Sequence, residues 1–93
     1  MTLEVWKPNR QVRSIRPGVT LRIQAPASFR LRWSSDEWRT TQETHATATV
    51  LNIHFCDIPV AIRQAGSIRL TFFWIADERW ESREYQIAIL SDT

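Results

Sequence analysis

Apolar and polar residues alternate with a period of two along most of the chain. Val19, Leu21 and Ile23 share one face of a segment whose other face carries polar side chains. The same alternation recurs at residues 28–33, 51–55, 68–74 and 85–89, and a shorter segment opens at Leu3 and Val5. Successive side chains of a strand point to opposite faces, so this period predicts half-buried β-strands.

Turn-forming residues separate these segments. Pro17-Gly18 precedes the strand at residues 19–24, and Ala25-Pro26 separates that strand from the next one. Ser34-Ser35-Asp36 is expected to turn the chain into residues 37–41, a further candidate strand. Pro59 is expected to end the strand that starts at residue 51, because proline cannot donate a backbone hydrogen bond. About seven short strands at this spacing predict an all-β fold, an immunoglobulin-like antiparallel β-sandwich.

The length of 93 residues suits one domain, residues 1–93, with a thin core. Residues 7–16 are polar, basic and poor in apolar side chains. We expect this segment to connect one sheet to the other, or to lead in from a preceding domain.

Charge and cysteine content exclude several functions. Twelve basic and ten acidic residues give a net charge of +2, and the arginines are spread from Arg10 to Arg83 instead of forming a basic stripe. This distribution argues against nucleic-acid binding. Cys56 is the single cysteine, and no metal-ligand spacing, phosphate-binding loop or membrane-length apolar run occurs. We expect no metal, no cofactor, no internal disulfide and no membrane partner.

Five tryptophans in a chain of this length are the most informative feature of the composition. Trp33 and Trp74 are in phase with the apolar positions of their strands, so both are expected to point into the core. Trp38 and Trp80 follow turns, where loops on a rigid scaffold often carry binding residues. A tryptophan ring can also stack on the apolar face of a sugar, although anchoring of the loop is the common alternative role.

Two other aromatic residues fall on the opposite face of their strands. Trp6 is out of phase with Leu3 and Val5, which predicts that it faces a neighbouring domain together with Lys7 and Arg10. Phe73 lies on the polar face of its strand and is expected to pack under arginine side chains or under a connecting segment.

Catalysis finds little support in the residues. Asp36-Glu37 and Asp77-Glu78 are adjacent acids on turns, whose side chains are expected to point apart. A pairing of Cys56 with a histidine is conceivable, but a thiol at a strand end is usually inert. We therefore expect no enzymatic activity from this chain alone.

Three stretches carry a resemblance to a known family. FRLRWSSDEWRTT at residues 29–41 resembles part of the C-terminal β domain of bacterial glucoamylase-type glucan 1,4-α-glucosidases. LEVWKPNRQVRSIRPGVTLRI at residues 3–23 and LTFFWIADERWESREYQIAI at residues 70–89 are similar to segments of the same domain, in the same order. Trp80-Glu81 also resembles the Trp-Glu signature of starch-binding modules.

The resemblance implies a role beside a catalytic domain of a glycoside hydrolase, which would carry the catalytic carboxylates. This chain would be a C-terminal accessory domain that binds α-glucan or braces the catalytic domain. In the binding version Trp38 and Trp80 stack on glucose units, while Glu81, Arg79 and Arg83 bond hydroxyl groups. The alternative is an arginine-rich module that binds protein or nucleic acid through Arg22, Arg30, Arg32 and Arg69 on one outward face.

Overall fold

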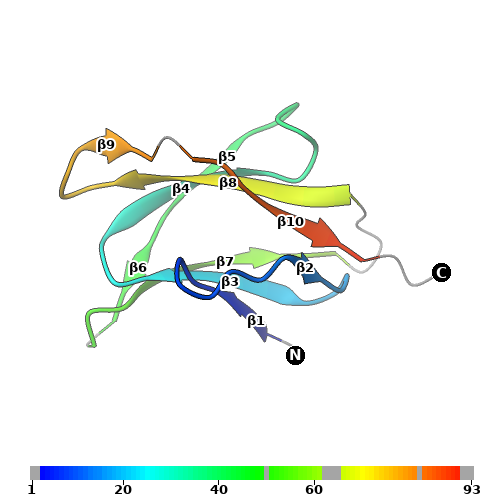
Figure 1. The fold of residues 1–93 in the computed structure, drawn as a ribbon, viewed down its shortest axis with the longest axis horizontal. Helices are drawn as coiled ribbons and strands as arrows, with labels where there is room; N and C mark the ends of the chain where they lie inside the picture. The colour runs from blue at the N-terminus through cyan, green and yellow to red at the C-terminus, as the bar shows by residue number, and fades with distance from the viewer. Residues whose placement is uncertain (1–2, 50, 62–65, 82, 91–93) are drawn as a thin grey trace.

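Two β-sheets pack face to face in the computed structural model, which describes residues 3–49, 51–61, 66–81 and 83–90. Figure 1 shows the two layers of this β-sandwich, with β4, β5, β8, β9 and β10 in one layer and β1, β3, β6 and β7 in the other. The described residues contain strands and turns but no helix, so none of them form a helix able to span a membrane.

The smaller sheet has four strands in the order β1-β3-β7-β6. Their bounds are Leu3–Trp6 for β1, Thr20–Ala25 for β3, His54–Pro59 for β7 and Thr47–Ala48 for β6. β3 pairs with β7 in antiparallel register, with Leu21 opposite Ile58 and Ile23 opposite Cys56.

The larger sheet has six strands. Its main order is β2-β10-β8-β4-β5, and β9 pairs with β8 beyond the end of β10. The bounds are Ser14–Ile15 for β2, Phe29–Ser34 for β4, Gln42–His45 for β5, Gly66–Trp74 for β8, Arg79–Trp80 for β9 and Tyr85–Ile89 for β10.

The predicted all-β sandwich is confirmed, but the prediction that it is purely antiparallel is wrong. β1 pairs with β3 in parallel, and β2 pairs with β10 in parallel. Both parallel strands come from the N-terminal segment, which lies along one edge of each sheet in turn. Residues 7–16 therefore cross from one sheet to the other, as the connector interpretation predicted.

The inward faces of both sheets form one apolar core. Its fully buried members include Leu21, Ile23, Leu31, Ile58, Ile68, Leu70 and Ile87, together with Phe29, Phe72 and Trp6. Trp33 and Trp74 are partly buried and pack against this core, so their inward orientation is confirmed. The Trp74 ring stacks on Phe72 with centroids 4.9 Å apart and an angle of 6° between the planes.

In two strands, β1 and β7, the side chains that were expected to point inward point outward. In β1 the Trp6 ring is 1% exposed and contacts Phe72, while Leu3 is 42% exposed. In β7 Cys56 and Ile58 point inward, and Phe55 lies on the outer face beneath the Arg22 guanidinium. Both segments carry apolar residues on both faces, so parity alone does not identify the buried face.

The turn at residues 34–36 is confirmed, but the expected strand at residues 37–41 is wrong. That segment is a loop, and β5 starts only at Gln42. The Asp36 carboxylate accepts bonds from both the backbone N–H and the hydroxyl of Thr40, at 2.9 and 2.6 Å. These bonds fold residues 36–40 back on themselves, as an Asp side chain commonly does at a turn.

Candidate functional site

Two aromatic rings lie side by side on the outer face of the six-stranded sheet. Phe73 of β8 is directly opposite Trp80 of β9, and their ring centroids are 5.0 Å apart. The Arg30 guanidinium carbon lies 4.6 Å from the centre of the Phe73 ring, and that of Arg32 lies 4.3 Å from the Trp80 ring. Of the two covers expected for Phe73, the structure shows the arginine.

One carboxylate fixes both arginines. Glu43 of β5 forms ion pairs with both arginines. Its Oε1 lies 3.2 Å from the Arg30 guanidinium, and its Oε2 lies 3.4 Å from the Arg32 guanidinium. The register places Glu43 opposite Arg32, so strand pairing brings these side chains together. Such exposed ion pairs add little to stability, but they hold the guanidinium groups over the rings. We call Arg30, Arg32, Glu43, Phe73 and Trp80 the outer patch.

Trp80 is the open part of the outer patch, since its side chain is 38% exposed. It sits just after the tight turn that joins β8 to β9, where Glu78 has a φ of 48° and its N–H bonds the Ile75 carbonyl at 3.2 Å. A wide apolar ring therefore stands on a rigid sheet beside guanidinium donors and carboxylate acceptors. Such a surface can stack on an apolar ring face and bond the polar groups at its rim.

Trp38 is held in the loop between β4 and β5. Its backbone N–H donates to the Ser34 hydroxyl at 2.9 Å, and its indole Nε1–H donates to Glu84 at 2.6 Å. Hydrogen bonds from Thr40 and Ser34 hold the Asp36 carboxylate in the same loop and lower its pKa to about 2. The indole is half-buried and its one polar group already has a partner.

The two turn tryptophans lie at different places on the same sheet. Trp38 reaches Glu84, which also lies 3.7 Å from Arg69 of β8, whereas Trp80 lies on Phe73. Arg69 and Phe73 point to the same face, four residues apart, which corresponds to roughly 13 Å of strand. A single sugar ring cannot reach both tryptophans, so a shared ligand would have to be a chain of several rings.

The other residues expected to bond hydroxyl groups, Glu81, Arg83 and Arg79, do not belong to the outer patch. Glu81 donates its backbone N–H to the Phe72 carbonyl at 2.8 Å, and the Arg83 guanidinium carbon lies 5.4 Å from the Tyr85 ring. Burial, and next the charge and hydrogen bonding of Glu81, raise the pKa of Tyr85. Arg79 is exposed and pairs with Trp74, so it leaves β9 on the side opposite Trp80.

The interpretation of Trp6 as a residue facing another domain is wrong, because its ring lies in the core between Phe72 and Tyr85. Lys7 is partly buried and Arg10 is exposed, and backbone hydrogen bonds of 3.2 and 3.0 Å between them close a tight turn. The arginine row is also divided. Arg22 lies on the other sheet, where it donates to Asp57 at 2.8 and 3.0 Å.

No group of three or more potential metal ligands lies together among the described residues. Cys56 is buried, and burial together with the nearby charge of Asp57 raises its pKa to about 12. A thiol in that state is a poor nucleophile at neutral pH.

The sequence reasoning missed the roles of Arg32 and Glu43 at Trp80. The alternation of Arg30 and Arg32 with Phe29 and Leu31 marked both as outward, but only the pairing of β4 with β8 and β5 brings them to the aromatic rings. Comparisons with protein-family models, curated proteins and solved structures gave no significant match to this chain.

Proposed function

We propose that this β-sandwich is an immunoglobulin-like, non-catalytic accessory domain of a glucoamylase-type glucan 1,4-α-glucosidase, and that it binds α-glucan at the outer patch. The observation that carries the proposal is the exposed Trp80 ring on a rigid sheet face, bordered by Arg32 and Phe73. The three stretches of sequence that resemble this family support the enzymatic context.

In the proposed complex the Trp80 indole stacks on the C–H face of one glucose unit. Arg30, Arg32 and Glu43 offer donors and an acceptor to the hydroxyl groups around that unit. Arg32 covers part of the indole in the free protein, so the ligand takes the uncovered ring surface or displaces the guanidinium. Trp38 contacts a later unit of the same glucan chain, since it lies along the sheet from Trp80.

A bracing contribution is compatible with the same domain and would use the other sheet. Leu3 is exposed and Val5 half-exposed on the outer face of the four-stranded sheet, where β1 forms the edge. A brace of this kind does not involve Trp80, so substitutions in the outer patch separate the two contributions.

The competing arginine-rich module draws less support from the ion pairs. Arg22, Arg30, Arg32 and Arg69 each contact an acidic side chain, which reduces the charge they offer to phosphate groups. Salt distinguishes the two functions, because binding to a nucleic acid weakens steeply with ionic strength. Stacking on a neutral glucan is expected to be nearly independent of salt.

The test is calorimetric titration of the domain with maltoheptaose and retention on amylose. Trp80→Ala is expected to weaken binding at least about tenfold, since loss of a central aromatic anchor is costly. Phe55→Ala is the matched control, because Phe55 is also an aromatic under an arginine but lies on the opposite sheet. Absence of binding by the unsubstituted domain, or equal affinity of Trp80→Ala, overturns the proposal.

A further inference from the structure

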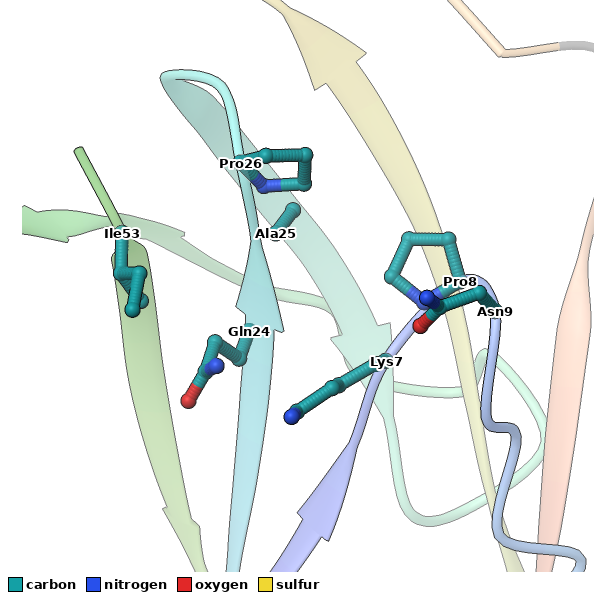
Figure 2. Close-up of a pocket in the computed structure, with 7 residues that line it drawn as sticks. All are labelled: Lys7, Pro8, Asn9, Gln24, Ala25, Pro26 and Ile53. Carbon is teal, nitrogen blue, oxygen red and sulfur yellow. The ribbon is translucent and has the colours of Figure 1, made fainter. Parts of the chain in front are cut away.

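A cavity of about 330 Å³ lies at one end of the outer face of the four-stranded sheet, away from the outer patch. Figure 2 shows its lining, with Lys7 following β1, Gln24 on β3 and Ile53 preceding β7. This volume is near the lower end of the range of small-molecule sites and would hold roughly ten waters. The cavity therefore suits a ligand no larger than an amino acid or a single sugar ring.

Lys7 is the unusual residue of this cavity. The partly buried arginines of the described residues, Arg22, Arg30 and Arg69, each have a carboxylate within 4 Å. Lys7 is the partly buried cation in the same part of the chain that has none. An ammonium without a carboxylate partner has N–H donors available for a bound anion.

Two carboxamides add unused hydrogen-bonding groups. The Asn9 and Gln24 side chains line the cavity, and neither has a hydrogen-bond partner among the described residues. In Figure 2 the Lys7 ammonium and the Gln24 carboxamide extend over the same side of the strands. An ammonium and amide N–H groups that line one cavity match the oxygens of a carboxylate.

The rest of the lining is apolar and stiff. Pro8 and Pro26 contribute rings, and Ala25 and Ile53 complete the apolar surface. Proline rings fix the local backbone, so this wall exists before any ligand arrives. An apolar wall beside a cation favours a ligand that carries a compact apolar group next to its charge.

We propose that this cavity is a binding site for a carboxylate that bears a compact apolar group, either a free small acid or the C-terminal residue of a peptide. Lys7 pairs with the carboxylate, Asn9 and Gln24 donate to it, and the apolar group lies against Pro26 and Ile53. A neighbouring depression shares Lys7 and Gln24 and also contains Glu4 and Arg10, which leaves room for the remainder of a peptide. The site does not depend on glucan binding.

The experiment is a two-dimensional NMR titration with N-acetyl-leucine and with N-acetyl-leucine amide, which share the apolar group and differ in charge. The acid is expected to bind at least about tenfold more tightly than the amide, as a charge-assisted hydrogen bond implies. The side-chain amide signals of Asn9 and Gln24 should shift with the acid. Tighter binding of a peptide that ends in leucine would assign the site to chain ends, and equal or weaker binding to free acids.

Two variants complete the test. Lys7→Gln is expected to bring the affinity for the acid down to that for the amide. Arg16→Gln removes one charge at the opposite end of the molecule, close to the turn where Gly18 bonds Val60, and is expected to change nothing. Equal affinities for acid and amide, or full binding by Lys7→Gln, overturn the proposal. If Lys7→Gln does not fold, the proposal is tested by the affinities of the unsubstituted domain for N-acetyl-leucine and N-acetyl-leucine amide.

Discussion

Phe72 and Phe73 are neighbours in β8 and end in opposite environments, which makes the two faces of the six-stranded sheet directly comparable. Phe72 is fully buried and contacts the rings of Trp6, Phe29, Trp74 and Tyr85. Phe73 lies between the Arg30 guanidinium and the Trp80 ring on the outer face. Both faces are aromatic, but the Phe72 ring packs against other rings, while the outer pair Phe73 and Trp80 is also covered by guanidinium groups.

Under the proposed function, the inner face serves folding and the outer face serves binding. The inner cluster removes a large apolar area from water and needs no polar partner, so its contribution is mainly to stability. The outer rings stay partly hydrated and are held in place by arginines that Glu43 fixes. Trp80 remains 38% exposed, so the outer rings add less buried apolar area to the fold than the inner cluster does.

The largest expected effect comes from the inner ring. Phe72→Ala should lower the free energy of unfolding by about 3–5 kcal/mol, because a cavity remains where the ring contacted four other aromatics. That is a large share of the stability of a small domain. Urea unfolding followed by tryptophan fluorescence measures it.

The matched substitution is Phe73→Ala in the next position of the same strand. It removes one tilted ring contact and one cation–π contact at the surface, so we expect a loss of about 1 kcal/mol. Similar decreases in the free energy of unfolding for Phe72→Ala and Phe73→Ala would mean that the inner and outer rings contribute equally to stability, which would contradict the comparison.

A second way to sharpen the comparison is the accessibility of the Cys56 thiol on the inner side of β7. Burial first, and then the charge of Asp57, raise its pKa to about 12 from an ordinary 9.0. At about pH 8, iodoacetamide should therefore modify the folded domain roughly a thousandfold more slowly than the urea-unfolded chain. Mass spectrometry over time gives both rates, and comparable rates would show that the sandwich opens readily.

The smallest expected effect concerns the loop that holds Trp38 on the outer side. Hydrogen bonds from Thr40 and then Ser34 lower the pKa of Asp36 from 3.8 to about 2. A carboxyl with a lowered pKa stabilises the fold above its unfolded pKa, and this contribution is lost as the pH falls toward about 2. The melting temperature should thus fall between about pH 5 and about pH 2.5.

Asp36→Asn serves as the control for that measurement, since its side chain does not titrate. Its melting temperature should change less over the same range of pH. A decrease as large in the variant as in the unsubstituted domain would assign the acid sensitivity to other carboxylates.

Much of the fold could be predicted where one face of a strand is apolar and the other polar. In β4 and β8 arginines and threonine alternate with large apolar residues, and the buried positions Leu31, Ile68 and Leu70 follow that alternation. In β1 and β7 apolar residues occur on both faces. Trp6 was therefore expected to face outward but is buried, and Phe55 was expected to be buried but lies on the outer face. Strict alternation is informative only where the two faces differ in chemistry.

The candidate site was predictable only in part. The turn before Trp80 marked that residue as exposed, and its side chain is 38% exposed. The contact of Arg32 with the Trp80 ring and the ion pair of Arg32 with Glu43 depend on the register of β4, β5, β8 and β9. No local sequence pattern reveals this register. The separation of Trp38 from Trp80 has the same origin, because Glu84 captures the Trp38 indole from a distant part of the chain.

The pairing of β2 with β10 bears on how this chain acquires its structure. Ser14 lies opposite Ala88 and Ile15 opposite Ile89. The N-terminal strand β2 can therefore join its sheet only when the C-terminal strand β10 is in place. Contacts between residues so distant in sequence slow folding, because the entropy of closing a long loop is lost first. During synthesis β1 can pair with β3 early, whereas β2 can join its sheet only after β10 has been made.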